Sequence, residues 1–365
     1  MKTTPYAPIF EISRGGITES IHYGSVAVVD SGGNLLAYYG DPYTVTYLRS
    51  SAKPFQAIPF LEHGGQQKYA LTSKEIALIC ASHAGTDEHV ATVCGIQAKT
   101  GVSEEHLMCG THPISDPVTV RAMRERGEQP SPNRHNCSGK HTGMLAFTRL
   151  LNLPVDAEPG KQAYIDQEHP VQKEILDTFA EMCGLTREDV HVGIDGCSVP
   201  NFAVPLYNAA FGLARLCDPH NLPDLRKEVC RTITSSMSAY PFMVAGPNGF
   251  DTHLMEKTGG RIVSKGGAEG YQAIGLLPGA LGKDSPGVGI TIKISDGDIA
   301  GRSRPDGNPA VYTRAAVALE VLRQLGVLTG SELESLELFG PVYTIFNWRK
   351  LEVGQGKPCF QLQKS

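Results

Sequence analysis

The sequence predicts an α/β (α+β) fold, in which an antiparallel sheet is flanked by helices and a second, helical lobe is added. Strand patterns lie towards both ends of the chain, whereas helical patterns gather in the middle. The 365 residues are long for one compact core and fit a large unit with two lobes. The 40 glycines and 24 prolines favour many turns over a long helical bundle.

The strands that support the sheet are short apolar runs bounded by turn residues. The first two flank Ser31-Gly32-Gly33, which is typical of a hairpin turn, and Asp296-Gly297 indicates another such turn. The predicted strands are residues 25–30, 34–38, 190–195, 261–267 and 288–294.

The helices are expected wherever apolar residues recur at helical spacing. The predicted helices are residues 73–80, 88–101, 143–151, 171–182, 206–216, 225–239 and 310–325, with one more beginning near Ser50. We therefore expect a single catalytic unit over 1–365, with a sheet lobe from about 1–60 and 240–365 and a helical lobe from about 61–239.

Composition excludes several classes of protein. The net charge of −5 argues against a nucleic-acid partner, which calls for a basic surface. No apolar stretch is long enough to span a membrane, so no membrane partner is expected. Nine cysteines, an odd number without a framework, point to free thiols in a reducing cytoplasm. The pattern is that of a cytoplasmic enzyme.

Ser50 and Lys53 form the most informative pair of residues. Residues i and i+3 lie on one face of a helix, so the hydroxyl and the amine could be within hydrogen-bond reach. Pro54 fits a first helical turn, where an N–H is not required. Such a pair activates a serine without histidine. The alternative is a serine cap followed by a surface lysine.

Six segments together resemble the rhizobial-type L-asparaginase II family, and the resemblance covers nearly the whole chain. The segments are RSSAKPFQ (49–56), CASHAG (80–85), HNCSGKH (135–141), DGCSVP (195–200), AGPNGFDT (245–252) and KGGAEG (265–270). The resemblance implies a fold similar to serine β-lactamases and glutaminases. It also implies a homodimer and the substrate L-asparagine.

The resemblance implies two Ser-Lys pairs, Ser50 with Lys53 and Ser82 with Lys265. We expect Lys53 to accept the proton of Ser50, which attacks the side-chain amide of asparagine. Ammonia leaves, and water hydrolyses the aspartyl ester while Ser82 and Lys265 relay protons. Lys265 would also supply the second cation that favours a neutral lysine base. Without the resemblance, Ser82 is a packing residue and Lys265 a solvated strand end.

The resemblance further implies a zinc ion held by Cys137, Lys140 and Cys197, with Asp195 beside it. From the residues alone the two cysteines could equally be buried thiols, because Cys-x-x-Lys is not a standard zinc spacing. His135 and His141 are alternative ligands. We expect the metal to orient the substrate, since a serine nucleophile is already present.

Substrate-binding residues are expected among the polar residues of the same segments. Arg49 suits the substrate carboxylate because its guanidinium can bind bidentately, and Glu269 suits the ammonium group. Asn248, Asp195 and His135 are further candidates, and His83 beside Ser82 is a candidate acid or base or a packed histidine. These candidates complete the expected site.

The predicted function is L-asparaginase, with three alternatives. Another amidohydrolase of the β-lactamase or glutaminase type would share the Ser-Lys pair. A β-lactam-hydrolysing enzyme would show Ser-Asp-Asn and Lys-Thr-Gly where this chain has Ser82-His-Ala and Lys265-Gly-Gly. A non-catalytic zinc or ligand-binding protein would not need a reactive Ser50. A nucleotide-binding role is disfavoured because no phosphate-binding loop motif occurs.

Overall fold

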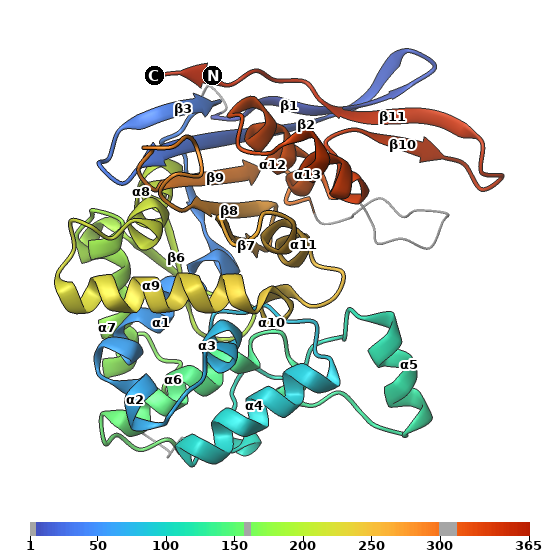
Figure 1. Cartoon of the computed structure of the whole chain (residues 1–365). Helices are drawn as coiled ribbons and strands as arrows, with labels where there is room; N and C mark the ends of the chain where they lie inside the picture. Colours follow the sequence, from blue (N-terminus) through green and yellow to red (C-terminus); the bar gives the residue numbers. More distant parts are fainter. Residues whose placement is uncertain (1–4, 157–161, 299–311) are drawn as a thin grey trace. The chain divides into compact units, whose positions relative to one another are not determined.

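The chain divides into two compact units in a computed structural model that describes residues 5–156, 162–298 and 312–365 (Figure 1). Unit 1 comprises 1–51, 204–218 and 253–365, and unit 2 comprises 52–203 and 219–252. The helix at Leu206–Cys217, which we expected in the helical lobe, belongs to unit 1 because it packs on the sheet.

Unit 1 is built on an antiparallel sheet, as predicted. In the described part of the chain it has nine strands in the order β10-β11-β1-β2-β9-β8-β7, with β3 beside β2 and β12 beside β3. The strands are β1 (Ala7–Arg14), β2 (Ile17–Asp30), β3 (Leu35–Tyr39), β7 (Ile262–Gly267), β8 (Tyr271–Leu276), β9 (Val288–Ile294), β10 (Tyr343–Phe346), β11 (Glu352–Pro358) and β12 (Gln363–Lys364). The short strand β4 (Val45–Tyr47) follows β3 in the chain.

Helices cover both faces of this sheet. In β9, Gly289 lies against the backbone of Ala210 in α8 (Leu206–Cys217), and Thr291 donates a hydrogen bond of 2.9 Å to the Leu206 carbonyl of the same helix. Side chains alternate along a strand, so Ile290 points to the other face. There α12 (Thr313–Gln324) packs on β1, β8, β9 and β11. All seven residues of β9 are therefore buried.

The remaining elements of unit 1 are α13 (Gly330–Ser335) and the 3-10 turn η5 (Glu337–Phe339), while α11 (Phe250–Lys257) spans the division between the units. The helix predicted over 310–325 is α12, although residues 310 and 311 lie outside the described residues. The segment after the predicted turn at Asp296-Gly297, residues 299–311, also lies outside them.

Unit 2 is helical. Its helices are α1 (Lys53–Glu62), α2 (Gly65–Lys68), α3 (Ser73–Ile79), α4 (Asp87–Thr100), α5 (Pro117–Glu125), α6 (Ser138–Leu150), α7 (Pro170–Met182), α9 (Asp224–Ala239) and α10 (Pro241–Ala245). Helix α1 packs on α6, α7 and α9, and α3 packs on α4, α6, α9 and α10. The core of the unit therefore surrounds α1 and α3, which carry no charged side chain there except Lys53 and Glu75.

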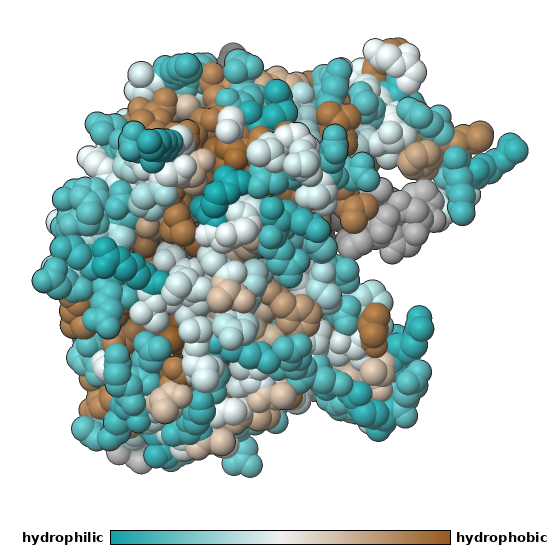
Figure 2. Space-filling model, viewed as in Figure 1, coloured by the Kyte–Doolittle hydropathy of each residue, from teal (hydrophilic) through white to brown (hydrophobic). Residues whose placement is uncertain are grey.

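Short elements complete unit 2. They are the 3-10 turns η2 (Glu104–His106), η3 (Pro132–Arg134) and η4 (Arg187–Asp189) and the strands β5 (His191–Ile194) and β6 (Pro200–Pro205), which pair antiparallel. Strand β6 continues into unit 1 from Val204. In the described residues no helix combines the length and apolarity needed to cross a membrane. Figure 2 shows hydrophilic and hydrophobic side chains interspersed over the face in view.

Candidate active site

Ser50 lies in a 3-10 turn, η1 (Arg49–Ala52), and Lys53 is the first residue of α1. Pro54 occupies the first turn of α1, as predicted, because proline needs no hydrogen-bond partner there. The helix expected near Ser50 therefore starts as a tighter turn, and the α-helix itself begins three residues later. Ser50 is partly exposed, whereas Lys53 is 1% exposed.

Lys53 is held by the loop that follows α3. Its Nζ donates hydrogen bonds to the Ala81 carbonyl at 2.5 Å and to Ser82 Oγ at 2.8 Å. Ser82 is partly exposed and belongs to an irregular segment, residues 81–86. The Ser82 amide donates to the Val244 carbonyl in α10 at 2.9 Å. A serine and a lysine are thus within proton-transfer distance in unit 2.

Lys265 lies on β7 in unit 1, next to the turn that carries Ser50. Ser51 Oγ donates a hydrogen bond of 2.6 Å to the Lys265 carbonyl. Gly267 fits closely here, since a Cβ would lie 2.5 Å from the Leu48 carbonyl oxygen. The Lys265 side chain is 2% exposed, and its Nζ donates to the Gly266 carbonyl at 2.7 Å. The backbone of β7 therefore braces the η1 turn.

The contacts differ in pairing from the expected Ser-Lys pairs. The structure joins Lys53 to Ser82 within unit 2, and the turn of Ser50 to the strand of Lys265 within unit 1. The expected pairs take one residue from each unit, and they stay predictions.

Cys137, Lys140 and Cys197, which the resemblance implies as zinc ligands, lie together in unit 2. Cys137 is the residue before α6 and Lys140 lies three residues later, so both face the same side of the first turn. Lys140 Nζ donates to Cys197 Sγ at 2.9 Å, and the Cys137 and Cys197 side chains are hydrogen-bonded to each other. The three side chains are buried, with exposed fractions of 5%, 3% and 2% in chain order.

The hydrogen bond between the two thiols of this cluster shifts their pKa values in opposite directions. The hydrogen bond from Cys197 lowers the pKa of the Cys137 thiol well below its usual value, against the effect of burial. The same bond and burial raise the pKa of the Cys197 thiol. Burial lowers the pKa of Lys140, but the Cys197 and Cys137 sulfurs have the larger combined effect. The pKa of Lys140 is therefore raised. Two sulfurs and one amine nitrogen therefore lie close together in this cluster.

His135 and Asp195 lie beside this cluster. His135 Nδ1 accepts a hydrogen bond of 2.9 Å from the Cys137 amide, and its side chain helps to lower the pKa of the Cys137 thiol. Asp195 is partly exposed in the loop between β5 and β6, where its Oδ1 accepts from the Gly196 amide at 2.8 Å. Asn248 lies exposed in the turn between α10 and α11. The cluster therefore carries a histidine and a carboxylate at its edge.

Arg49 and Glu269 form an ion pair in unit 1, with 3.6 Å between Nη1 and Oε1. Both residues have positive φ angles, 53° and 59°. This conformation costs a non-glycine residue about 1–3 kcal/mol, which exceeds the value of a partly exposed ion pair, about 0–1 kcal/mol. Strain that an ion pair does not offset is typical of functional positions, so the geometry supports a binding role for both side chains.

Three contributing residues were not predicted from the sequence. Ser51 ties η1 to β7, and Ser138 opens α6 next to Cys137. Lys293 in β9 is buried and donates to the carbonyls of Ile294, at 2.9 Å, and of Glu269, which holds the strained turn. No sequence signal could have found the lysine, because its role depends on the pairing of β8 with β9.

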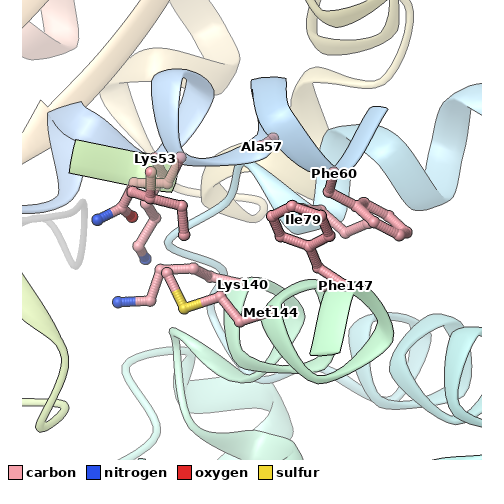
Figure 3. Close-up of a pocket in the computed structure, with 10 residues that line it drawn as sticks. Lys53, Ala57, Phe60, Ile79, Lys140, Met144 and Phe147 are labelled. Carbon is pink, nitrogen blue, oxygen red and sulfur yellow. The ribbon is translucent and has the colours of Figure 1, made fainter. Parts of the chain in front are cut away.

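A small apolar cavity of about 10 Å³ lies behind Lys53 and Lys140. A cavity of this size holds one water molecule at most. Figure 3 shows the two lysine side chains side by side at one end, and the rings of Phe60 and Phe147 at the other. The two lysine side chains are thus packed against apolar surroundings. The lining residues are Lys53, Gln56, Ala57, Phe60, Ile79, Lys140, Gly143, Met144, Phe147 and Ile175.

Comparison with protein families finds a match to L-asparaginase II over residues 10–358. Comparison with curated proteins finds no match. The match spans every residue of the candidate site, from Arg49 to Glu269.

Comparison with solved structures finds distant likenesses. A probable glutaminase from Bacillus subtilis complexed with 6-diazo-5-oxo-L-norleucine has a TM-score of 0.35 at 12% identity, with 83% of this chain and 84% of that chain covered. A Bacillus glutaminase in 4.3 M NaCl has a TM-score of 0.36 at 11% identity, with 83% and 91% covered. Nothing further is inferred from likenesses of this extent.

Proposed function

Because the chain belongs to the L-asparaginase II family, we propose that it hydrolyses L-asparagine to L-aspartate and ammonia through an acyl-enzyme formed on a serine. Its class follows from the family: the chain is an amidohydrolase that acts on a carboxamide. The observation that carries the serine-lysine mechanism is the 2.8 Å hydrogen bond between Lys53 Nζ and Ser82 Oγ. A buried amine at this distance is suited to exchange a proton with a hydroxyl.

In the proposed first step, Ser50 Oγ attacks the side-chain amide carbon of asparagine, and Lys53 takes the hydroxyl proton. The proton passes through the Lys53–Ser82 hydrogen bond to the departing nitrogen, which leaves as ammonia. Backbone amides at the helix start that follows Ser50 are proposed to stabilise the oxyanion. Water then attacks the aspartyl ester, gives its proton to the same path, and the Ser50 hydroxyl is restored. Lys265 supplies a second cation, which favours the neutral form of the lysine base.

A second assignment of the nucleophile is supported by the same contact. Ser82 is the serine whose Oγ is hydrogen-bonded to Lys53. In this version Lys53 is the base, Ser82 carries the aspartyl ester, and Ser50 passes the proton. The two versions share one lysine and differ in which serine carries the acyl group.

The charged ends of the amino-acid substrate match the strained ion pair. We assign Arg49 to the substrate carboxylate and Glu269 to its ammonium group, since the two side chains already face each other at 3.6 Å. Asn248, Asp195 and His135 are proposed to contribute further polar contacts. Substrate binding would separate the pair, and each charge would keep an opposite partner.

The cysteine cluster fits a zinc ion. Two sulfurs and an amine are ligands that zinc accepts, and three protein ligands leave a fourth position open. Among the described residues no group of three histidine, cysteine, aspartate or glutamate side chains could hold a metal, so Lys140 would be the third ligand beside Cys137 and Cys197. Zinc would bind the deprotonated forms of these three side chains. Bound zinc would orient the substrate.

The cellular location and the oligomeric state are also proposed from the sequence. We propose that it acts in the cytoplasm, which the nine free cysteines support, and that it forms a homodimer. Light scattering of the purified protein would show twice the mass of one chain, and a single chain mass would contradict the dimer.

Ammonia release from L-asparagine tests the function. The wild type is expected to turn over, while Ser50→Ala and Lys53→Met lose at least about a thousandfold in kcat, as expected when a nucleophile or its base is removed. Cys137→Ser, assayed with and without added zinc, is expected to weaken substrate binding, seen as a higher KM. A wild type that releases no ammonia from asparagine would refute the proposal, and a Ser50→Ala variant with normal turnover would move the acyl group to Ser82.

A further inference from the structure

The Ser82 loop has no regular secondary structure to hold it. Residues 81–86 belong to neither a helix nor a strand, so no ladder of backbone hydrogen bonds fixes the position of Ser82. One end is tied to α10 by the Ser82 amide. At the other end, the Gly85 carbonyl accepts from Arg134 and the Thr86 amide donates to His89 Nδ1. Between these ends lies His83, which is 2% exposed.

His83 connects the loop to the start of α6. Its Nδ1 accepts a hydrogen bond from the Gly85 amide at 3.1 Å, and its Nε2 lies 2.9 Å from Ser138 Oγ. Its own amide donates to the Asn136 carbonyl at 3.2 Å. Ser138 is the first residue of α6 and directly follows Cys137. A single side chain thus joins the serine loop to the helix end that carries the predicted metal ligands.

The hydrogen bonds determine which nitrogen of His83 carries the proton. The Gly85 amide can only donate, so Nδ1 is an acceptor without a hydrogen. The Ser138 hydroxyl donates to the Asn133 carbonyl at 2.8 Å, so its oxygen is free to accept from Nε2–H. Burial, with His89 and Lys53 nearby, keeps the pKa of His83 well below its usual value. The ring is therefore neutral, with both nitrogens in use.

A neutral His83 also packs on a second fixed ring. It stacks on His89 with 4.9 Å between ring centroids, and His89 stacks on Phe242 at 4.9 Å. His89 Nε2 lies 3.0 Å from the Phe242 carbonyl in α10, and burial lowers the pKa of His89 to about 4. The stack leaves His83 little freedom to rotate.

We infer that His83 is a positioning residue, whose imidazole ties the Ser82 loop to the first turn of α6 and so holds the Ser82 hydroxyl against Lys53 Nζ. The inference rests on the proposed function, in which that hydroxyl passes a proton. His83 cannot also act as the acid or base that the sequence left open, because both ring nitrogens are bound to protein. Displacing a reacting group by about 1 Å can cost about a hundredfold in rate.

His83→Phe tests this role because phenylalanine keeps the stacked ring and removes both hydrogen bonds. We expect kcat for asparagine to fall about tenfold to a hundredfold while KM changes less than about threefold. His83→Gln is expected to recover most of the rate, since its amide nitrogen can reach Ser138. A His83→Phe variant with kcat within about threefold of wild type would overturn the inference.

His169 provides a matched control. It is also buried, and its Nδ1 accepts a hydrogen bond from the amide two residues later, Val171, at 3.3 Å. His169→Phe removes the same local contact at the start of α7, so it should lower the melting temperature and leave kcat unchanged. An equal loss of kcat in both variants would mean that His83 acts on stability alone, and would overturn the inference.

Two further measurements keep the test decisive. If His83→Phe does not fold, Ser138→Ala removes the other end of the bridge and should also lower kcat; an unchanged kcat contradicts the inference. Hydrogen exchange does not need activity: amides of 81–86 should exchange faster in His83→Phe than in His169→Phe, and equal rates contradict the tether. A wild type without asparaginase activity would refute the proposed function, and the exchange rates would still decide the tether.

Discussion

Arg134 is the buried cation that fastens the far end of the Ser82 loop. Its side chain is 4% exposed and donates to the Gly85 carbonyl at 2.7 Å, to Asp87 at 2.6 Å and to Glu128 at 2.5 Å. The hydrogen bonds from Arg134, helped by Arg126, lower the pKa of both carboxyl groups. Each carboxylate is thus more strongly ionised in the folded state than in the unfolded state.

The lowered pKa values predict how acid affects stability. A carboxyl group whose pKa is depressed by folding stabilises the protein above its unfolded pKa, and this stabilisation is lost as the pH falls through the folded pKa. Arg134→Met should reduce the free energy of unfolding by about 2 kcal/mol at pH 7, because hydrogen bonds to charged groups are lost. The difference from wild type should shrink below the usual carboxyl range, towards pH 3. Urea denaturation at both pH values measures it.

Arg126 serves as the control for this prediction. It binds the same carboxylates, Asp87 and Glu128, but its side chain is 44% exposed. Solvent screens exposed ion pairs, so Arg126→Met should cost less stability than Arg134→Met. If Arg134→Met lowered the free energy of unfolding equally at pH 7 and pH 3, the role of the carboxylates would be contradicted.

Among single residues, the sequence predicted which reactive side chains lie near one another better than which of them form hydrogen bonds. Cys137, Lys140 and Cys197 were expected together, and the structure brings them together. Lys53 donates a hydrogen bond to Ser82, which was expected to pair with Lys265, and the expected Ser50–Lys53 pair stays a prediction. Spacing informs only about neighbours in the chain, and the loop after α3 reaches Lys53 through tertiary packing.

At the scale of elements, α6 reaches the site because two glycines let it approach α3. A Cβ at Gly139 would lie 2.3 Å from the Leu78 carbonyl oxygen, and one at Gly143 would lie 2.8 Å from Ile79 Cγ2. The backbone of α3 cannot move aside as a side-chain end could. This close approach sets how far the first turn of α6, with Lys140, extends towards Lys53.

Gly139→Ala should therefore destabilise unit 2. Alanine favours a helix over glycine by about 1 kcal/mol, but overpacking costs about 1–3 kcal/mol, and the clash with backbone places the change at the upper end. We expect a net loss of about 1–2 kcal/mol, measured by urea denaturation. Gly95, in α4, is the control. The nearest atom to a Cβ there is Glu75 Oε1, at 3.6 Å, so Gly95→Ala should be neutral or more stable. A stabilised Gly139→Ala would contradict the packing argument.

Helices with clear periodicity and caps were predictable from the sequence. The structure gives α3, α4, α7 and α9 within one or two residues of the predicted ranges. The first turn of α6 was missed because Ser138 and Gly139 are poor helix formers, and packing on α3 overrides that preference. Also missed were the first half of β2 and the strands β1, β4, β6, β8, β10, β11 and β12. In β2 the first residues, including Glu19, are solvent-exposed, so no apolar run marks them.

At the scale of the whole molecule, the sheet of unit 1 unites the two ends of the chain. Strands β1 and β2 from the N-terminal part pair with β11 and β9 from the C-terminal part. Apolar patterns revealed that strands lie at both ends, and hence the antiparallel sheet. They could not give the strand order, because pairing depends on contacts between residues hundreds of positions apart. The boundary at α8 was missed for the same reason.

The central claim is an aspartyl ester on Ser50, with Lys53 as the proposed base and the Lys53–Ser82 hydrogen bond as the proposed proton path. The most direct measurement is intact-mass and peptide analysis after rapid acid quenching of enzyme with asparagine, in wild type, Ser50→Ala and Ser82→Ala. Ser82→Ala should slow ester hydrolysis and accumulate the adduct. The account predicts one aspartyl group on the peptide that contains Ser50, and none in Ser50→Ala. An adduct on Ser82, or turnover without any serine adduct, would contradict it.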